Sequence, residues 1–243
     1  MRSVATGVRR RASIDLDAII ANARISTSDL SVSVADLRAD AYGHGFAPVL
    51  SALGEAGVRT FLASNHEDAA LVRSIDPHMR VHLGGSESPA RPLPSQVIGL
   101  GLYGLGVAPG LRPTLRLSGE VIAVKTIPGG SGVSYGYTYR TSAPTRLALV
   151  ALGFADGVPR VASNRAPVLV NGFRALVAGR IAMDQFVVDL GDHAASVGDE
   201  AILLGDASRD EPTVEDWAEA ARVRPEVILS GLGKRIERAY SRA

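Results

Sequence analysis

The sequence predicts an α/β domain followed by a β domain, and two observations lead to this prediction. Through Gly104, short apolar runs alternate with helical patterns, which is typical of parallel βα units. From Leu111, the chain becomes a series of short β-rich segments separated by glycine, proline and aspartate, which is typical of a compact β domain. We therefore assign residues 1–104 to the α/β domain and residues 105–243 to the β domain.

Composition excludes several classes of protein. Apolar residues make up 46% of the 243 residues, and a net charge of +1 gives no support for binding to nucleic acid or to an acidic membrane surface. The absence of cysteine excludes disulfides, thiolate metal sites and cysteine nucleophiles. No apolar run reaches the length of a membrane span, and the basic residues Arg9, Arg10 and Arg11 are not followed by the apolar segment of a signal peptide. We expect a cytoplasmic protein.

The predicted elements of the α/β domain alternate along the chain. Asp17 and Asn65 are suitable helix caps, and Gly57 marks a helix end. Between Leu83 and Val97 the chain is rich in glycine, serine and proline and has no helical pattern. Strands are expected at residues 12–16, 30–35, 60–63, 80–83 and 97–104, and helices at residues 17–24, 47–56 and 66–75.

The β domain is expected to contain six strands and one helix. The helix, at residues 214–222, is amphipathic and includes Trp217. The strands are expected at residues 114–127, 147–152, 168–170, 175–177, 185–190 and 200–204.

Residues 37–45 are the stretch where we expect chemistry. They follow the apolar run at residues 30–35, include Gly43 and Gly45, and precede a predicted helix. α/β enzymes place functional side chains where a strand gives way to a turn before a helix. Arg38 lies near the start of this stretch and is therefore the first candidate site residue.

Five segments resemble the alanine racemase family. Residues 37–45 are similar to the end of the family's first barrel strand. Residues 133–139, 152–157 and 170–185 match three blocks of the family's C-terminal domain in order and spacing, and residues 234–240 resemble its final strand. The resemblance implies an alanine-racemase-type (β/α) barrel portion followed by a C-terminal β domain.

The resemblance assigns roles to Tyr135 and Arg38. In this family a lysine and a tyrosine face each other across pyridoxal phosphate (PLP) and alanine, and each moves the Cα proton on its own side. Tyr135 stands at the tyrosine's position, although an ordinary strand tyrosine would look the same in isolation.

Arg38 stands at the position of the lysine, which holds PLP as a Schiff base. A Schiff base needs a neutral primary amine, and a guanidinium group stays protonated. We therefore expect Arg38 to be neither a PLP anchor nor a base. Two interpretations stay open: Arg38 pairs with a phosphate or carboxylate, or it occupies a site under no catalytic demand.

Four further positions are carried over from the resemblance. Tyr42 matches a tyrosine near the PLP phosphate, and Gly99 and Leu100 match residues whose backbone amides approach that phosphate. Met183 matches a residue whose backbone amide meets the substrate carboxylate. These positions make up the expected cofactor-binding and substrate-binding set.

The sequence departs from the family in two further ways. Val97, Phe154 and Pro225 stand where the family has an arginine and two tyrosines. The middle barrel strands are absent between Leu83 and Val97, together with the family residues that bind the phosphate and grip the substrate carboxylate. A complete barrel has eight strands and takes about 250 residues. We therefore expect a truncated barrel of four strands whose edges need to be covered.

These features predict an alanine-racemase-like protein that is inactive or severely impaired. It would be a pseudoenzyme or remnant, or a partner that dimerises with a complete racemase and lends it Tyr135 and Met183. The alternative is a PLP-dependent racemase that interconverts L- and D-alanine. Covalent PLP binding is predicted to be absent, and noncovalent binding stays open. The resemblance implies a homodimer, with a heterodimer as the second arrangement.

Few other residues are candidates for this chemistry. Lys125 and Lys234 are the only lysines, and neither is an evident substitute for the family lysine. The five histidines show no spacing typical of metal ligands, so no metal site is expected. We interpret His44 as a packed turn residue.

Overall fold

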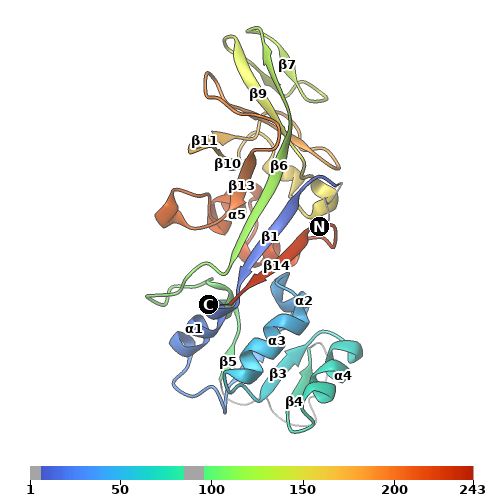
Figure 1. The fold of residues 1–243 in the computed structure, drawn as a ribbon, viewed down its shortest axis with the longest axis vertical. Coiled ribbons are helices and arrows are strands. Elements are labelled where there is room, and N and C mark those ends of the chain that lie inside the picture. The colour runs from blue at the N-terminus through green and yellow to red at the C-terminus, as the bar shows by residue number, and fades with distance from the viewer. Residues whose placement is uncertain (1–6, 85–95, 243) are drawn as a thin grey trace, which may run out of the picture. The chain divides into compact units, whose positions relative to one another are not determined.

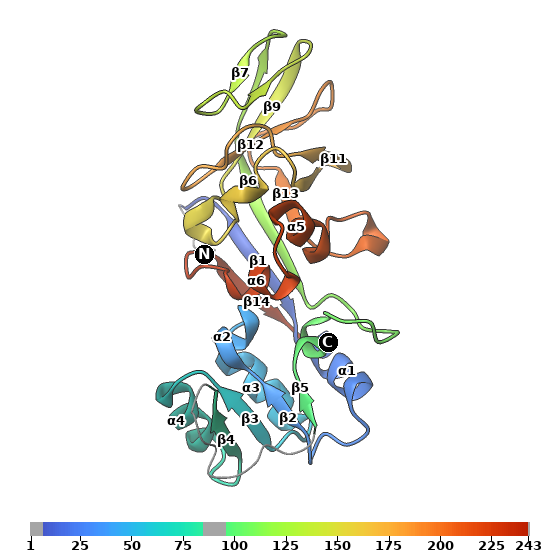
Figure 2. The ribbon, with the colours of Figure 1, turned by 180° about the vertical axis from the view of Figure 1, so that it is seen from behind.

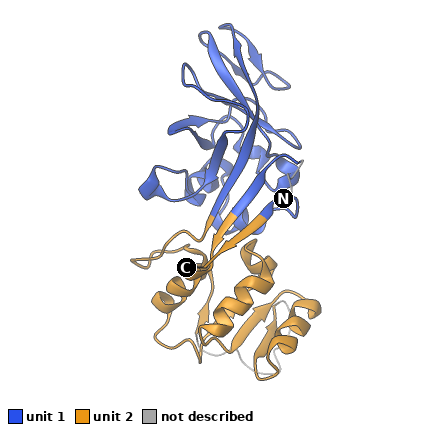
Figure 3. Ribbon diagram, viewed as in Figure 1, with its two compact units in different colours: residues 1–12, 116–237 blue, residues 13–115, 238–243 orange. Residues whose placement is uncertain are grey.

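The computed structural model describes residues 7–84 and 96–242, and the chain forms two compact units (Figure 3). The α/β unit comprises residues 13–115 and 238–243, and the β unit comprises residues 1–12 and 116–237. The start of the chain thus belongs to the β unit and its end to the α/β unit. The predicted connection between Leu83 and Val97 lies outside the described residues, apart from Gly84 and Gln96.

A four-stranded parallel sheet forms the centre of the α/β unit (Figures 1 and 2). The strands are β2 (Val34–Asp36), β3 (Thr60–Ala63), β4 (Arg80–Leu83) and β5 (Val97–Ile98). Their order is β4-β3-β2-β5, and each neighbouring pair is parallel. Among the described residues β4 and β5 are the edges of this sheet, so the predicted truncated barrel is confirmed as an open sheet.

Three right-handed helices accompany this sheet: α1 (Leu16–Ser26), α3 (Phe46–Glu55) and α4 (His66–Ile75). Asn65 caps α4 as predicted, because its side chain accepts a hydrogen bond from Asp68 N. The prediction that Asp17 caps α1 is wrong by two residues. Asp15 is the cap, since its backbone is extended and its carboxylate accepts from Ala18 N at 2.8 Å.

Two predicted strands of the α/β domain are shorter than expected. The strand expected at residues 97–104 ends at Ile98, and a 3₁₀ helix, η1 (Leu100–Tyr103), takes up the rest. Gly104 ends η1 with φ +79°, a left-handed conformation that favours glycine. The strand expected at residues 30–35 begins only at Val34, because Asp29 binds the backbone and hydroxyl of Ser31 and so competes with strand pairing.

The β unit is built around β6 (Leu115–Ile127), the longest strand. β6 pairs antiparallel with β13 (Glu200–Leu204) and with β9 (Thr145–Val150). The order of the eight-stranded sheet is β11-β10-β13-β6-β1-β14, and β12 pairs with β9. The remaining strands are β1 (Arg10–Asp15), β10 (Pro167–Val170), β11 (Phe173–Leu176), β12 (Phe186–Asp189) and β14 (Glu237–Ser241). All six strands predicted for this domain are confirmed.

Short elements complete the β unit. A hairpin joins β7 (Gly132–Val133) to β8 (Tyr139–Arg140), and η2 (Phe154–Asp156), η3 (Arg160–Ala162) and η4 (Ala207–Arg209) are 3₁₀ helices. The predicted helix is α5 (Val214–Ala221), and α6 (Pro225–Ser230) follows it. Trp217 is buried on α5, and its indole N–H donates to Pro167 O at 2.9 Å.

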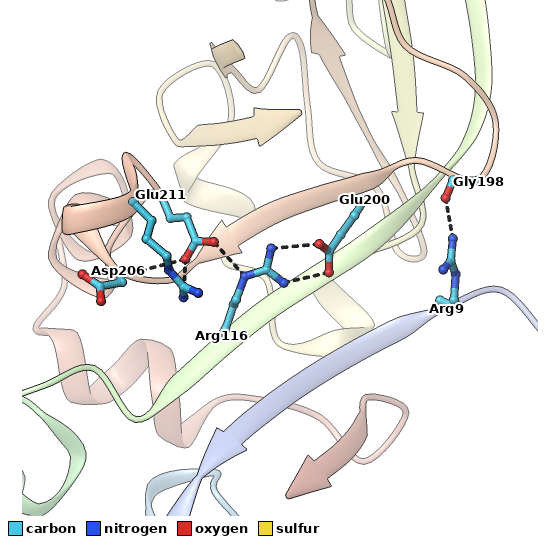
Figure 4. Close-up of polar contacts among 7 residues, drawn as sticks. Arg9, Arg116, Gly198, Glu200, Asp206 and Glu211 are labelled. Atoms are coloured by element: carbon cyan, nitrogen blue, oxygen red, sulfur yellow. Dashed lines mark hydrogen bonds and ion pairs between the residues drawn. The ribbon is translucent and has the colours of Figure 1, made fainter. Parts of the chain in front are cut away.

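A network of arginines and carboxylates ties β6 to the rest of the β unit (Figure 4). The Arg116 guanidinium donates two hydrogen bonds of 2.8 Å to Glu200 and one of 2.8 Å to Glu211. Glu211 is buried and also accepts from Arg209 and from Asp206 N. Arg116 lowers the pKa of Glu200 by hydrogen bonding to its charged form.

A second buried carboxylate, Asp156, fixes the turn that follows β9. Asp156 Oδ2 accepts from Gly153 N and Asp156 Oδ1 accepts from Arg235 Nε, both at 2.9 Å. Arg10 Nε forms an ion pair with Asp156 Oδ2 at 3.4 Å. The next residue, Gly157, has φ +95° and lies against the backbone of Gly231, which leaves no room for a Cβ atom. Glycine is therefore required at position 157 by both backbone conformation and packing.

We predict that Gly157→Ala destabilises the β unit by about 2–4 kcal/mol, because a left-handed alanine is strained and its Cβ overlaps Gly231 O. Gly172→Ala is the matched control: Gly172 also has a positive φ, +77°, but nothing lies within 4 Å of a Cβ built there. We expect about 1 kcal/mol for the control. Urea unfolding followed by the fluorescence of Trp217, the single tryptophan, measures both. Equal shifts would contradict the packing explanation.

A fully buried histidine lies in the α/β unit, as the sequence interpretation of His44 predicted. Its Nδ1 lies 3.1 Å from Ala41 O and 3.0 Å from Tyr42 O, and its Nε2 lies 2.8 Å from Thr114 Oγ1. Both neighbours of Nδ1 are carbonyl oxygens, so Nδ1 carries a hydrogen. The Thr114 hydroxyl beside Nε2 also donates to Tyr103 O at 3.2 Å. The ring also packs on Tyr103, with centroids 4.7 Å apart. Burial, with a smaller contribution from the charge of Arg238, lowers the pKa of His44 to about 4.

This depressed pKa predicts an acid-sensitive α/β unit. Between about pH 6.5 and pH 4 the unfolded histidine binds a proton that the folded ring does not, so stability falls as the pH decreases. The full loss is about 3 kcal/mol, because one pKa unit corresponds to about 1.4 kcal/mol.

His44→Asn removes this titration while keeping a side-chain donor for the two carbonyls. Urea midpoints measured by circular dichroism across this pH range should therefore vary less in the variant than in the parent protein. An unchanged pH dependence would show that another group is responsible.

Candidate functional site

A left-handed turn follows β2 and forms the centre of the candidate site. The segment α2 (Arg38–Tyr42) begins as a helical turn, but Ala39, Asp40, Ala41 and Tyr42 have φ values of 53°, 58°, 52° and 49°. Left-handed backbone costs about 1–2 kcal/mol for each residue other than glycine. A run of four such residues persists only where the surroundings determine it, and strain of this kind marks functional sites.

Hydrogen bonds from neighbouring segments hold this turn. Ala39 N donates to Ser64 Oγ at 2.8 Å, and the Asp40 carboxylate accepts from Phe46 N at 2.8 Å. Gly43 ends the turn with φ +79°, and its carbonyl accepts from Arg238 Nε at 2.8 Å. The turn is thus tied to the segment after β3, to the start of α3 and to β14.

Arg38 begins the turn and is paired with Asp36, the last residue of β2. Arg38 Nε and Nη2 donate to the two Asp36 carboxylate oxygens at 2.9 Å and 2.7 Å, and Arg38 N donates to the same carboxylate at 3.1 Å. The Asp36 side chain is only 4% exposed, whereas that of Arg38 is 46% exposed. The guanidinium is therefore the partner that neutralises a buried carboxylate.

Two tyrosines surround this ion pair. Tyr42 donates from its hydroxyl to Asp36 Oδ2 at 3.3 Å, and the buried Tyr103 donates to Asp36 O at 2.8 Å. The two rings are packed with centroids 5.0 Å apart. Burial, followed by the charge of Asp36, raises the pKa of both phenols, and hydrogen bonding to Asp36 raises the pKa of Arg38. The Arg38 guanidinium and both phenols therefore keep their usual charge near neutral pH.

The structure brings four predicted site residues to the same edge of the parallel sheet. Arg38 and Tyr42 follow β2, and Gly99 and Leu100 follow β5, the strand paired in parallel with β2. The carboxyl ends of parallel strands meet at one edge, where α/β proteins bind their ligands. Among residues 7–84 and 96–242, no atom lies within 4 Å of a Cβ built on Gly99.

The other two predicted site residues, Tyr135 and Met183, belong to the β unit. Tyr135 donates from its hydroxyl to Ile181 O at 3.5 Å, two residues before Met183. The guanidinium groups of Arg160 and Arg180 lie 5.4 Å and 5.8 Å from the centroid of the Tyr135 ring. Tyr135 and Met183 thus lie on neighbouring loops of one surface.

This surface of the β unit exposes apolar side chains. Tyr135 is 45% exposed, Met183 is 55% exposed, and Phe154 is also exposed. Phe154 N donates to Ala182 O at 3.0 Å, which joins the loop after β9 to the loop that carries Met183. We refer to Tyr135, Phe154, Met183, Arg160 and Arg180 as the aromatic–arginine surface. Apolar side chains that are exposed together mark binding surfaces more often than single exposed ones do.

Sequence reasoning missed several residues of both groups. Asp36 was not recognised, although an acidic residue directly after an apolar strand is a signal that could have been used. Tyr103 was placed in a strand, and no local pattern indicates its contact with Asp36. Arg160 and Arg180 are two among many arginines, so nothing in the sequence singles them out.

Within residues 7–84 and 96–242, no three histidine, aspartate or glutamate side chains gather so as to hold a metal ion. Over the same residues, no helix has both the length and the apolarity needed to cross a bilayer.

Comparison with known proteins identifies the family. Residues 14–97 match the N-terminal domain of alanine racemase, and residues 114–240, more than half of the chain, match its C-terminal domain. A curated alanine racemase from Thermobifida fusca is 49% identical over 150 residues, which is 60% of this chain and 40% of that protein. The aligned segment therefore spans about two fifths of that relative's length.

Solved structures show the same fold. An alanine racemase from a D-cycloserine producing Streptomyces lavendulae aligns with a TM-score of 0.84 and 29% identity over 98% of this chain and 98% of that one. An alanine racemase from Bartonella henselae, solved with covalently bound pyridoxal phosphate, aligns with a TM-score of 0.81 over 97% of this chain and 100% of that one; at 21% identity it supports the fold alone. On the two domain matches, the chain belongs to the alanine racemase family.

Proposed function

We propose that this chain is an alanine-racemase-family protein with little or no racemase activity of its own. The observation that carries the proposal is the Asp36–Arg38 ion pair at the end of β2. In the family resemblance, position 38 is the point of covalent PLP attachment. Here that position holds the Arg38 guanidinium, which forms an ion pair with the buried Asp36 carboxylate.

The residues at the end of β2 do not fit covalent attachment of PLP. Attachment requires a neutral primary amine that attacks the aldehyde carbon, and a guanidinium is delocalised and stays protonated. Hydrogen bonding to Asp36 raises the pKa of Arg38 further. Tyr42, the predicted phosphate contact, already donates its hydroxyl to Asp36.

The two lysines offer no evident replacement. Lys125 lies on β6 and Lys234 precedes β14, and both are exposed residues of the β unit. Neither belongs to the unit that carries the left-handed turn.

The open sheet supports the same proposal. Only 13 residues separate the end of β4 at Leu83 from the start of β5 at Val97, and β5 pairs directly with β2. In the family resemblance, the missing middle strands carry the groups that bind the phosphate and grip the substrate carboxylate. Reduced binding of cofactor and substrate follows from their loss, in addition to the missing amine.

The alternative function is that of a PLP-dependent alanine racemase with a rearranged site. The 49% identity to a protein named as an alanine racemase favours this alternative. It requires an attached cofactor on Lys125 or Lys234 and a new grip for the substrate. The two functions make opposite predictions about the same measurement.

We predict that the purified protein, incubated with PLP and reduced with borohydride, carries no stoichiometric adduct on either lysine. Mass spectrometry of peptides locates any label, and weak nonspecific labelling of exposed amines is expected. D-alanine formed from L-alanine should not exceed a blank without protein, while a full-length alanine racemase serves as the positive control. A stoichiometric adduct on one lysine together with D-alanine formation would establish the alternative.

A second candidate function, that of a partner subunit, is favoured by the aromatic–arginine surface. Tyr135 and Met183 are exposed together, and the arginines stacked on Tyr135 provide cationic groups beside them. In the family resemblance, the tyrosine and the residue at Met183 reach the partner's cofactor across a dimer interface. This chain could therefore complete the site of a full-length racemase although its own site lacks an amine, and a homodimer would use the same surface.

We predict that the chain forms a homodimer by light scattering and co-elutes with a full-length alanine racemase when the two are mixed. If Tyr135 completes the partner's site, Tyr135→Phe lowers the racemase activity of the mixture by at least about tenfold, because it removes the proton-transfer hydroxyl. The variant keeps the aromatic ring, so it should still co-elute with the racemase. A monomer that neither co-elutes nor alters the racemase's activity would exclude this candidate.

A further inference from the structure

Asp36 places a buried negative charge beside position 38. It is a carboxylate at the end of a buried parallel strand, and the Asp36 residue is 3% exposed. Its oxygens accept from Arg38 N, Nε and Nη2 and from the Tyr42 hydroxyl. A buried carboxylate with this set of donors favours a cation at position 38.

We infer that Asp36 is a second barrier to covalent attachment of an aldehyde cofactor, so that a lysine introduced by Arg38→Lys reacts slowly and replacement of Asp36 by a neutral residue speeds its reaction. The inference rests on the proposed function and deepens it, because it names the residue that would hold even a restored amine in its charged form.

The geometry supports this inference. Residues 36 and 38 are two apart at the end of a strand, and the side chain at position 38 extends along the Asp36 carboxylate to within 2.7–2.9 Å. The Arg38 side chain also passes the backbone of Gly84, where a built Cβ would lie 2.5 Å from Arg38 Cδ. Asp36 and Gly84 thus confine the stem at position 38 between them, and a lysine stem would follow the same path to the same carboxylate.

Charge then decides the reactivity of that lysine. An opposite charge within about 4 Å favours the ammonium form, and each unit by which its pKa rises lowers the fraction of neutral amine about tenfold. Asp36→Asn removes the negative charge with almost no change of shape. The side-chain amide of the variant still offers an oxygen to the backbone N–H at position 38 and a polar group to the Tyr42 hydroxyl, so contacts that hold the left-handed turn persist.

The attachment step is a condensation. The neutral amine nitrogen attacks the aldehyde carbon, and both amine hydrogens leave with the aldehyde oxygen as water when the C=N bond forms. Borohydride then delivers hydride to the carbon and solvent supplies a proton to the nitrogen, which leaves a stable secondary amine. The reaction needs no group from the protein other than the neutral amine.

The test compares Arg38→Lys with the double variant Asp36→Asn/Arg38→Lys, with Asp36→Asn alone as the background. Each full-length protein is incubated with PLP, reduced with borohydride and digested, and mass spectrometry measures labelling at position 38. We expect labelling in the double variant to be at least about tenfold faster than in Arg38→Lys, which corresponds to a pKa difference of one unit or more. Across a pH series, labelling of Arg38→Lys should reach its midpoint at a pH at least about one unit higher than labelling of the double variant does.

The outcomes separate this inference from the proposed function. Equal labelling of the two lysine variants at position 38, or labelling of neither, would overturn the role of Asp36. Stoichiometric labelling of Lys125 or Lys234 in the unsubstituted protein would instead contradict the proposed function. Circular dichroism and the thermal midpoint confirm that each variant is folded, and Asp36→Val/Arg38→Lys replaces the double variant if the asparagine form does not fold.

Discussion

The Asp36 carboxylate is the constraint on which the functional edge of the α/β unit depends. Four consecutive left-handed residues cost about 1–2 kcal/mol each, so their conformation must be imposed from outside. Asp36 acts at both ends of this turn, because it accepts from the backbone and side chain of Arg38 and from the hydroxyl of Tyr42. The buried rings of His44 and Tyr103 pack against each other beside it. Truncation of the Asp36 side chain would therefore affect both the cation at position 38 and the backbone that follows.

Arginine performs the same structural task in the β unit. Arg116 binds Glu200 and Glu211, and Arg235 binds Asp156 and Asp184. A guanidinium suits these places because its planar array of donors serves two carboxylates at once, whereas an ammonium acts as a compact point charge. Of the 26 basic residues only two are lysines. The use of arginine instead of lysine, which suits the buried carboxylates, therefore also leaves the chain with few amines for covalent chemistry.

Membership of the family and catalytic function depend on different features of this protein. The matches to both alanine racemase domains and the structural alignments establish the fold. Function is decided by particular groups at the edge of the parallel sheet, since one fold can carry different activities or none. The open sheet contains four strands, and the residue at the end of β2 is engaged in an ion pair. The aromatic–arginine surface depends only on loops of the β unit and does not require the missing strands.

The sequence by itself determined most of the elements, the family and the absence of an amine at position 38. These conclusions rest on local patterns: the alternation of apolar residues, caps such as Asn65, and the identity of single side chains. It misplaced the cap of α1 by two residues and extended the strand at residues 97–104 too far, because neighbouring aspartates are equivalent in sequence and glycines permit several conformations. Only the tertiary structure decided that Arg38 neutralises the buried Asp36 and that Ala39 and Ala41 are left-handed. Alanine has no local preference for that backbone, so contacts from distant segments, such as Ser64 and Arg238, are needed to impose it.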